Sequence, residues 1–205
     1  APEPAPEVVA EAAGVLEQTR LNIKWFLRKL FISRYFYSET CVRKRISSPV
    51  EFAIGSIRTL HARWPAPDFQ ERLQAMGQAL LAPPNVKGWE GERSWINASA
   101  WAARLEFAHD LAELADDESS FGPDLDLHQL VPTDVKEPAK VVDALAARLM
   151  PGDFPTEARG PLAEFLVKTD EGPKPNQFHD DEGFRASRIR GALALVLSLP
   201  EYHAY

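Results

Sequence analysis

Apolar residues recur at every third or fourth position in many segments of this chain, and this spacing constrains the fold more than any other feature. Because an α-helix has 3.6 residues per turn, such spacing gathers the apolar side chains on one face of a helix. No segment of alternating β-branched residues predicts a sheet. We therefore expect an all-α fold, an irregular multi-helix bundle with one long ordered loop. Helices are predicted over residues 7–18, 22–36, 48–62, 68–82, 97–115, 138–150, 156–168 and 182–199.

Several of these helices have start or stop signals in the sequence. Ser48 can cap a helix, Pro49 suits its first turn, and Glu51 can accept a hydrogen bond from the amide of the cap residue. Asp68 begins a second box with the same spacing. Prolines at 83–84 cannot donate backbone hydrogen bonds, so they are expected to end the helix that starts at that box.

The composition is that of a globular protein, with 45% hydrophobic and 26% charged residues among 205. The longest apolar run, 191–199, is about half the roughly 20 residues that a membrane-spanning helix needs. The one cysteine, Cys41, excludes an internal disulfide and leaves the cellular compartment undecided.

The chain is long enough for one or two domains. Residues 1–6 (APEPAP) are interpreted as a linker or cut end. Residues 7–115 form a predicted N-terminal helical group. Residues 116–136 are acidic and broken by prolines, which predicts a connector at the surface. Residues 137–205 form a predicted C-terminal helical group, which we expect to pack on the first.

The loop 83–96 (PPNVKGWEGERSWI) has no helical or alternating pattern but carries two tryptophans, which predict that it is ordered. Exposed tryptophans here would form a platform for a sugar ring, with polar side chains binding its hydroxyls. The interpretation we favour is that the tryptophans anchor the loop in the helical core, and that Asn97 caps a helix. The candidate ligand-binding residues are Trp89, Trp95, Glu92, Arg93 and Asn97.

Positive charge is concentrated near one end of the chain. From Arg20 to Arg63 there are ten basic and two acidic residues, whereas the net charge of the whole chain is −7. A helix start at Ser48 adds free amides, so this region is a candidate anion-binding surface. Pairing with acidic parts of the protein is the favoured alternative, and the acidic overall balance disfavours nucleic acid. The candidate anion-binding residues are Arg43, Lys44, Arg45 and Arg58.

Catalytic and metal-binding patterns give no positive prediction. The row from His179 to Glu182 holds four possible ligands, but neighbouring side chains diverge, so Asp180 or Asp181 is interpreted as a helix cap. No histidine pair has metalloprotease spacing, and no phosphate-binding glycine loop or nucleophile elbow is present. We predict no metal and no cofactor, and catalytic residues stay unknown because carboxylates far apart in sequence can meet in the fold.

Three strings of the sequence resemble the bacterial DUF1800 family, a domain of unknown function. They are YFYSETCVRKRISSPVEFAIGSIRTL at 35–60, GQALLAPPNVKGWEGERSWINASAWAARLEFA at 77–108, and ALALVLSLPEYHAY at the end. Family members show SPVE, MGQ, PPNVxGW, WIN and a terminal LxLxSPEF in this order. Leu199 and Tyr202 depart from that last string, in which a small residue and phenylalanine are common.

The resemblance implies that this chain is similar to the C-terminal half of a longer protein, because members are about twice as long. It also implies an extracytoplasmic (periplasmic or secreted) location and a sulfatase-like partner protein, and it transfers no catalytic residue. We therefore expect a helical binding or partner-interaction module for a protein or a cell-envelope polymer. The missing N-terminal half is itself a possible partner. The alternative is a hydrolase acting on anionic or sulfated polysaccharide beside the sulfatase-like partner.

Overall fold

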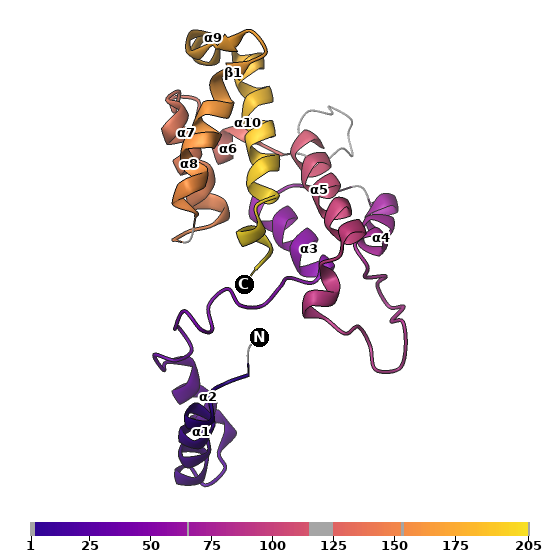
Figure 1. Ribbon diagram of the computed structural model, residues 1–205, viewed down its shortest axis with the longest axis vertical. Helices are drawn as coiled ribbons and strands as arrows, with labels where there is room; N and C mark the ends of the chain where they lie inside the picture. Colours follow the sequence, from indigo (N-terminus) through magenta and orange to yellow (C-terminus); the bar gives the residue numbers. More distant parts are fainter. Residues whose placement is uncertain (1–2, 65, 115–124, 153, 205) are drawn as a thin grey trace. The chain divides into compact units, whose positions relative to one another are not determined.

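The computed structural model describes residues 3–64, 66–114, 125–152 and 154–204. Ten α-helices and one two-stranded sheet occur in these ranges, so the predicted all-α fold is confirmed (Figure 1). The chain divides into two compact units, residues 1–46 with 204–205 and residues 47–203. We call these the first unit and the second unit and describe each by itself.

The first unit contains a pair of helices that pack side by side, α1 (Pro6–Gln18) and α2 (Ile23–Phe31). Asn22 caps α2, and its side chain accepts a hydrogen bond from the amide of Trp25 at 3.3 Å. The predicted helix 22–36 was too long, because α2 ends at Phe31. Ser33 explains the early end, since its hydroxyl donates to the carbonyl of Leu30 at 2.7 Å and competes with the helical pattern.

The second unit contains the remaining elements. They are α3 (Pro49–Leu60), α4 (Ala66–Ala75), the 3₁₀ turn η1 (Glu92–Trp95), α5 (Ala98–Glu113), α6 (Leu127–Leu130), α7 (Pro138–Leu149), α8 (Thr156–Val167), β1 (Lys168–Thr169), β2 (Gly172–Pro173), α9 (Pro175–Asp180), α10 (Glu182–Leu197) and the 3₁₀ turn η3 (Pro200–His203). Residues 116–124 of the predicted connector lie outside the described residues, and α6 occupies part of the rest.

Helix α10 lies at the centre of the second unit, where it packs against α5, α7, α8 and α9 (Figure 1). Its fully buried residues include Ala192, Leu193 and Val196, which meet Phe107 and Leu111 of α5 in one continuous apolar core. The close approach of α8 explains a glycine in α10. A Cβ atom at Gly191 would lie 2.8 Å from Cζ of Phe165, so a larger residue would force the two helices apart.

The start signals read from the sequence are confirmed where the chain forms α3 and α10. Ser48 accepts from the amide of Glu51 at 3.3 Å, and the Glu51 carboxylate accepts from the amide of Ser48 at 2.9 Å, which completes the capping box. Asp181 caps α10 by accepting from the amide of Phe184 at 2.9 Å.

The prediction for the helix at 68–82 was wrong at both ends. Helix α4 begins at Ala66, so Asp68 lies inside its first turn rather than at the cap. The helix ends at Ala75, well before the prolines, because Gly77 adopts a φ of +100° that suits glycine. The amide of Gln78 then bonds the carbonyl of Leu73 at 2.9 Å, as in a Schellman motif.

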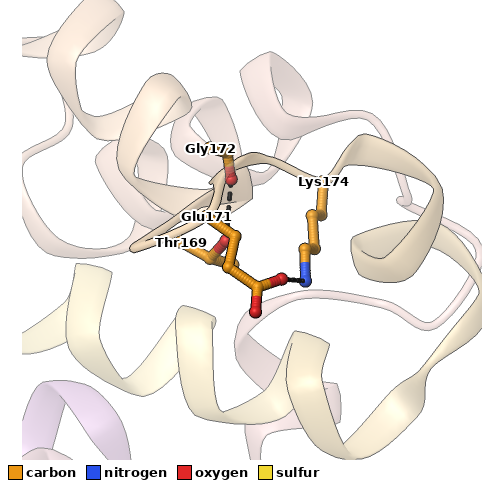
Figure 2. A network of polar contacts seen from close by, with 4 residues as sticks. All are labelled: Thr169, Glu171, Gly172 and Lys174. Carbon is orange, nitrogen blue, oxygen red and sulfur yellow. Dashed lines mark hydrogen bonds and ion pairs between the residues drawn. The ribbon is translucent and has the colours of Figure 1, made fainter.

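A short hairpin joins α8 to α9 and was not predicted, because each of its strands has only two residues. Figure 2 shows its tip, where the hydroxyl of Thr169 donates to the carbonyl of Gly172 at 2.8 Å. Nζ of Lys174 lies 2.6 Å from Oε2 of Glu171. Since both charged side chains are at the surface, this pair contributes little to stability.

Within the described ranges, the helices are all too short or too polar to cross a bilayer.

Candidate functional site

The loop 83–96, which we call the Trp loop, leaves the body of the second unit and returns at η1 (Figure 1). The side chain of Trp95 is 7% exposed. It lies beside two glycines, since a Cβ atom at Gly77 would be 4.0 Å from its ring and one at Gly91 would be 3.9 Å away. Trp89 is half-buried. Trp95 is therefore a buried anchor at the returning end of the loop, beside Gly77 and Gly91.

The polar candidates of the loop lie on η1 and at the start of α5. Glu92 and Arg93 are exposed on η1, and Glu92 has a φ of +52°. The side chain of Asn97 caps α5, accepting from the amide of Ala100 at 2.9 Å and from the hydroxyl of Ser99 at 2.7 Å. Asn97 is thus engaged by the helix start.

Exposed apolar side chains lie just before the Trp loop and near its start. Leu81 is 99% exposed, Val86 is fully exposed, and Leu80 is partly exposed. We call these three residues the apolar edge. Leu81 also has a φ of +60°, a left-handed conformation that is strained for a branched side chain. Sequence reasoning concentrated on the tryptophans and missed this edge, although the paired leucines before the prolines were a visible signal.

The basic candidates are divided between the two units. Arg43, Lys44 and Arg45 belong to the first unit, and Arg43 has a φ of +53°. Arg58 belongs to the second unit, on the last turn of α3, and is exposed. Because a helix rises about 1.5 Å per residue, Arg58 lies roughly 15 Å along the axis from the start of α3 at Ser48. It does not add to the positive field at that helix start.

The second unit also buries an arginine, which the sequence analysis did not single out. Arg104 of α5 is fully buried and donates from Nη2 to the carbonyl of Ser47 at 2.7 Å. Nη1 lies 3.2 Å from Nδ1 of His203, and this ring nitrogen accepts because a guanidinium can only donate. The carbonyl of His203 in turn accepts from the amide and the hydroxyl of Ser47, at 2.8 and 2.9 Å. These bonds join segments that are 156 residues apart.

Aromatic rings enclose this polar cluster of Ser47, Arg104 and His203. The ring centroids of Phe52 and Trp101 lie 4.4 and 4.7 Å from that of His203. Burial, together with the positive charge of Arg104, lowers the pKa of His203 to about 3. The imidazole is therefore neutral near pH 7 and enclosed. A buried neutral histidine that accepts from arginine links η3 to α5.

The strings on which the family resemblance rests meet in the second unit. The hydroxyls of Ser56 and Tyr202 lie 3.1 Å apart, and the amide of Val50 donates to Oε1 of Gln78 at 3.0 Å. A family model described as a protein of unknown function, DUF1800, matches residues 1–204. The chain belongs to the DUF1800 family. No curated protein matches it, and no solved structure does.

In this DUF1800 chain, the residues of the characteristic strings have structural roles that can be named. Ser48 and Glu51 cap α3, Trp95 anchors the loop, Asn97 caps α5, and His203 binds Arg104. Each of these five residues therefore has a role in folding.

Clusters of metal ligands and surface cavities are further features that could form a binding site. Within the described residues, no three histidine, cysteine, aspartate or glutamate side chains are grouped as metal ligands. A surface cavity of about 620 Å³ lies between α6 and α10, where its lining includes Asp126, His128, Glu182, Arg185 and Arg190. Both signs of charge are present, and Arg185 donates from Nη2 to the carbonyl of Val135 at 2.6 Å. This arrangement does not select one class of ligand.

Proposed function

We propose that this chain is a non-catalytic, extracytoplasmic interaction module, and that the apolar edge of the Trp loop binds a partner protein. The single observation that carries the proposal is Leu81, whose side chain is 99% exposed while its backbone has a φ of +60°. A left-handed conformation costs about 1–2 kcal/mol for such a residue, and full exposure of the side chain gains nothing in return. Strained, exposed residues of this kind are typical of binding sites.

Burial of the apolar edge by a partner would offset the free-energy cost of the strained conformation of Leu81. Covering a leucine or valine side chain stabilises a complex by about 1.5–3 kcal/mol for each residue. Trp95 supports the proposal because it holds one end of the loop in place. A loop that is already ordered loses less conformational entropy when a partner binds.

A protein partner suits this loop better than a polysaccharide. Stacking on a sugar ring needs an accessible aromatic face, whereas Trp95 is buried and Trp89 is half-buried. The resemblance described above supplies two candidates, a further part of a longer protein and a sulfatase-like protein. Support for the extracytoplasmic location comes from the resemblance alone.

The alternative, a hydrolase acting on anionic polysaccharide, needs a cleft that holds two or more carboxylates near Trp89. Cavities of about 620, 590, 430 and 310 Å³ on the described surface are lined by residues outside the Trp loop. No specific observation favours hydrolysis over binding, so it stays a prediction from the sequence.

Site-specific photocrosslinking tests the proposed interaction. A photoreactive amino acid is placed at position 81 or 86 of the full chain in the cells that produce it, and adducts are identified by mass spectrometry. The matched control carries the same group at Leu195, an exposed apolar residue on α10 of the same unit. We expect one protein to crosslink from positions 81 and 86 and not from 195, and Leu81→Ser to weaken its binding at least tenfold.

Two results would contradict the proposal. One is equal crosslinking from all three positions, which would indicate random collisions. The other is binding to a glycan array that Trp89→Ala abolishes and Leu81→Ser does not change, which would assign the loop to a carbohydrate.

A further inference from the structure

The first unit exposes apolar side chains to an unusual extent. Among its described residues no side chain is buried, including those of α1 and α2. Two apolar residues of α2, Phe26 and Leu30, are only half-covered by α1. The large hydrophobic residues that are exposed are Val9, Leu21, Ile23, Trp25, Leu27, Phe31, Ile32, Phe36, Tyr37 and Val42. Exposed apolar surface on this scale is typical of a region that another phase or molecule covers.

Positive charge accompanies this apolar surface. The described α2 segment and its flanks expose Arg20, Lys24, Arg28, Lys29 and Arg34. Over residues 20–46 the sequence has eight basic residues and one acidic residue. An occupant of this surface must therefore be both apolar and anionic.

We propose that the first unit binds the surface of an anionic lipid bilayer, with α2 lying in the interface. On α2, Ile23, Leu27 and Phe31 recur at four-residue spacing and form an uncovered ridge, and Lys24 and Arg28 form the adjacent row. Apolar residues including tryptophan and phenylalanine, set beside a cationic face, are typical of helices that lie in a membrane interface. The basic side chains would reach the lipid headgroups while their stems stay in the apolar layer.

The distribution of the apolar residues favours a bilayer over a protein groove. A groove takes one ridge of a helix, whereas here exposure continues beyond α2 through Ile32, Phe36 and Tyr37. Ring contacts join this extension to the helix, since the ring centroids of Phe31 and Phe36 are 5.1 Å apart and those of Phe36 and Tyr37 are 5.2 Å apart. A fluid apolar layer covers such an irregular surface without needing a matching shape. A second copy of the unit is disfavoured because two cationic surfaces repel.

Vesicle binding by the full chain tests this proposal. We expect sedimentation with phosphatidylcholine vesicles that contain phosphatidylglycerol, and at least tenfold weaker binding to phosphatidylcholine alone. The double substitution Lys24→Gln and Arg28→Gln is expected to weaken binding about 25-fold, because each basic residue near an anionic surface contributes about fivefold. Added salt is expected to weaken binding in the same direction.

Insertion of apolar side chains into the bilayer is tested by replacing an exposed residue, so that the free protein stays folded. Ile32 lies just after α2 and is 73% exposed, so Ile32→Ser removes no packing contact of a core. We expect it to weaken vesicle binding about tenfold, as for partial burial of a large aliphatic side chain. Val86→Ser in the Trp loop is the control and is expected to have no effect, which separates this proposal from the one for the apolar edge.

Trp25 reports on depth in the bilayer, since it is the one tryptophan among residues 1–46. The fluorescence of Trp25 is obtained as the difference between the wild-type protein and the Trp25→Phe variant. Brominated lipids are expected to quench this contribution. The proposal is overturned by equal binding to zwitterionic and anionic vesicles, by binding without quenching of Trp25, or by loss of binding with Val86→Ser. Tighter binding to an acidic polypeptide such as polyglutamate would also overturn it and assign the surface to an acidic protein.

Discussion

The two units of this protein differ in how far their apolar and charged side chains are buried. The second unit buries a continuous apolar core and encloses Arg104 and His203 within it. The first unit has no buried side chain among its described residues, although α2 carries Trp25 and Phe31. Periodic apolar spacing in the sequence is common to both. The comparison shows that the same helical pattern can occur over a buried core or on an exposed surface.

The largest effect is expected from removing the buried arginine. Arg104→Met keeps the length of the side chain but leaves the carbonyl of Ser47 and Nδ1 of His203 without the donors they have now. Loss of one partner from a buried polar cluster costs about 3–5 kcal/mol of unfolding free energy. Urea denaturation measures it, with the exposed Arg58→Met as control. A change below about 1 kcal/mol would mean that this cluster does not stabilise the second unit.

The anchor of the Trp loop comes next. Trp95→Ala removes a buried ring and is expected to lower the unfolding free energy by about 3 kcal/mol. Trp89→Ala is the matched comparison, and because Trp89 is half-buried we expect less than half of that loss. Thermal melting of both variants compares them directly. Equal losses of stability in the two variants would contradict the conclusion that Trp95, and not Trp89, anchors the loop.

Acid is expected to weaken the second unit through His203. Its pKa is about 3 in the folded protein and about 6.5 in an unfolded chain. Between these values the unfolded state binds a proton that the folded state does not, so stability falls as the pH falls. From pH 6.5 to pH 4 the loss is about 3 kcal/mol. His203→Asn keeps an acceptor for Arg104 without titrating, and its stability is expected to change less over this range. Parallel pH profiles would contradict the lowered pKa.

The smallest effect is expected in the first unit. Ile32→Ser changes an exposed side chain that packs in no core, so the unfolding free energy in the absence of lipid should change by less than about 0.5 kcal/mol. Leu193→Ser in the buried part of α10 is the contrasting substitution and is expected to lower the unfolding free energy by about 3 kcal/mol. A large loss with Ile32→Ser would reveal a core that the first unit does not have in this structure.

The sequence predicted those parts of the fold whose signals are local. The capping box at Ser48, the cap at Asn97 and the cap at Asp181 depend on residues within one helical turn, so they are legible without the fold. The early end of α4 was missed because Gly77 terminates it through a φ that the sequence does not state. The hairpin at 168–173 was missed because two-residue strands leave no alternation to detect.

Less of the candidate site than of the fold could be predicted from the sequence. Trp95 as an anchor was the favoured interpretation, but the exposure of Leu81 depends on where the loop runs in space. Arg104 was missed because its partners, Ser47 and His203, lie 57 and 99 residues away. Charge patterns located the basic segment, yet only the fold separates Arg58 from Arg43 into different units.

Hydrogen exchange of the full chain tests most directly whether only the second unit has a core of its own. Without lipid, we predict that amides of α2 exchange through local opening, orders of magnitude faster than those of α5 and α10, which should exchange only by global unfolding. Anionic vesicles are expected to slow α2 selectively. Protection of α2 equal to that of α10 in the free protein would contradict the account.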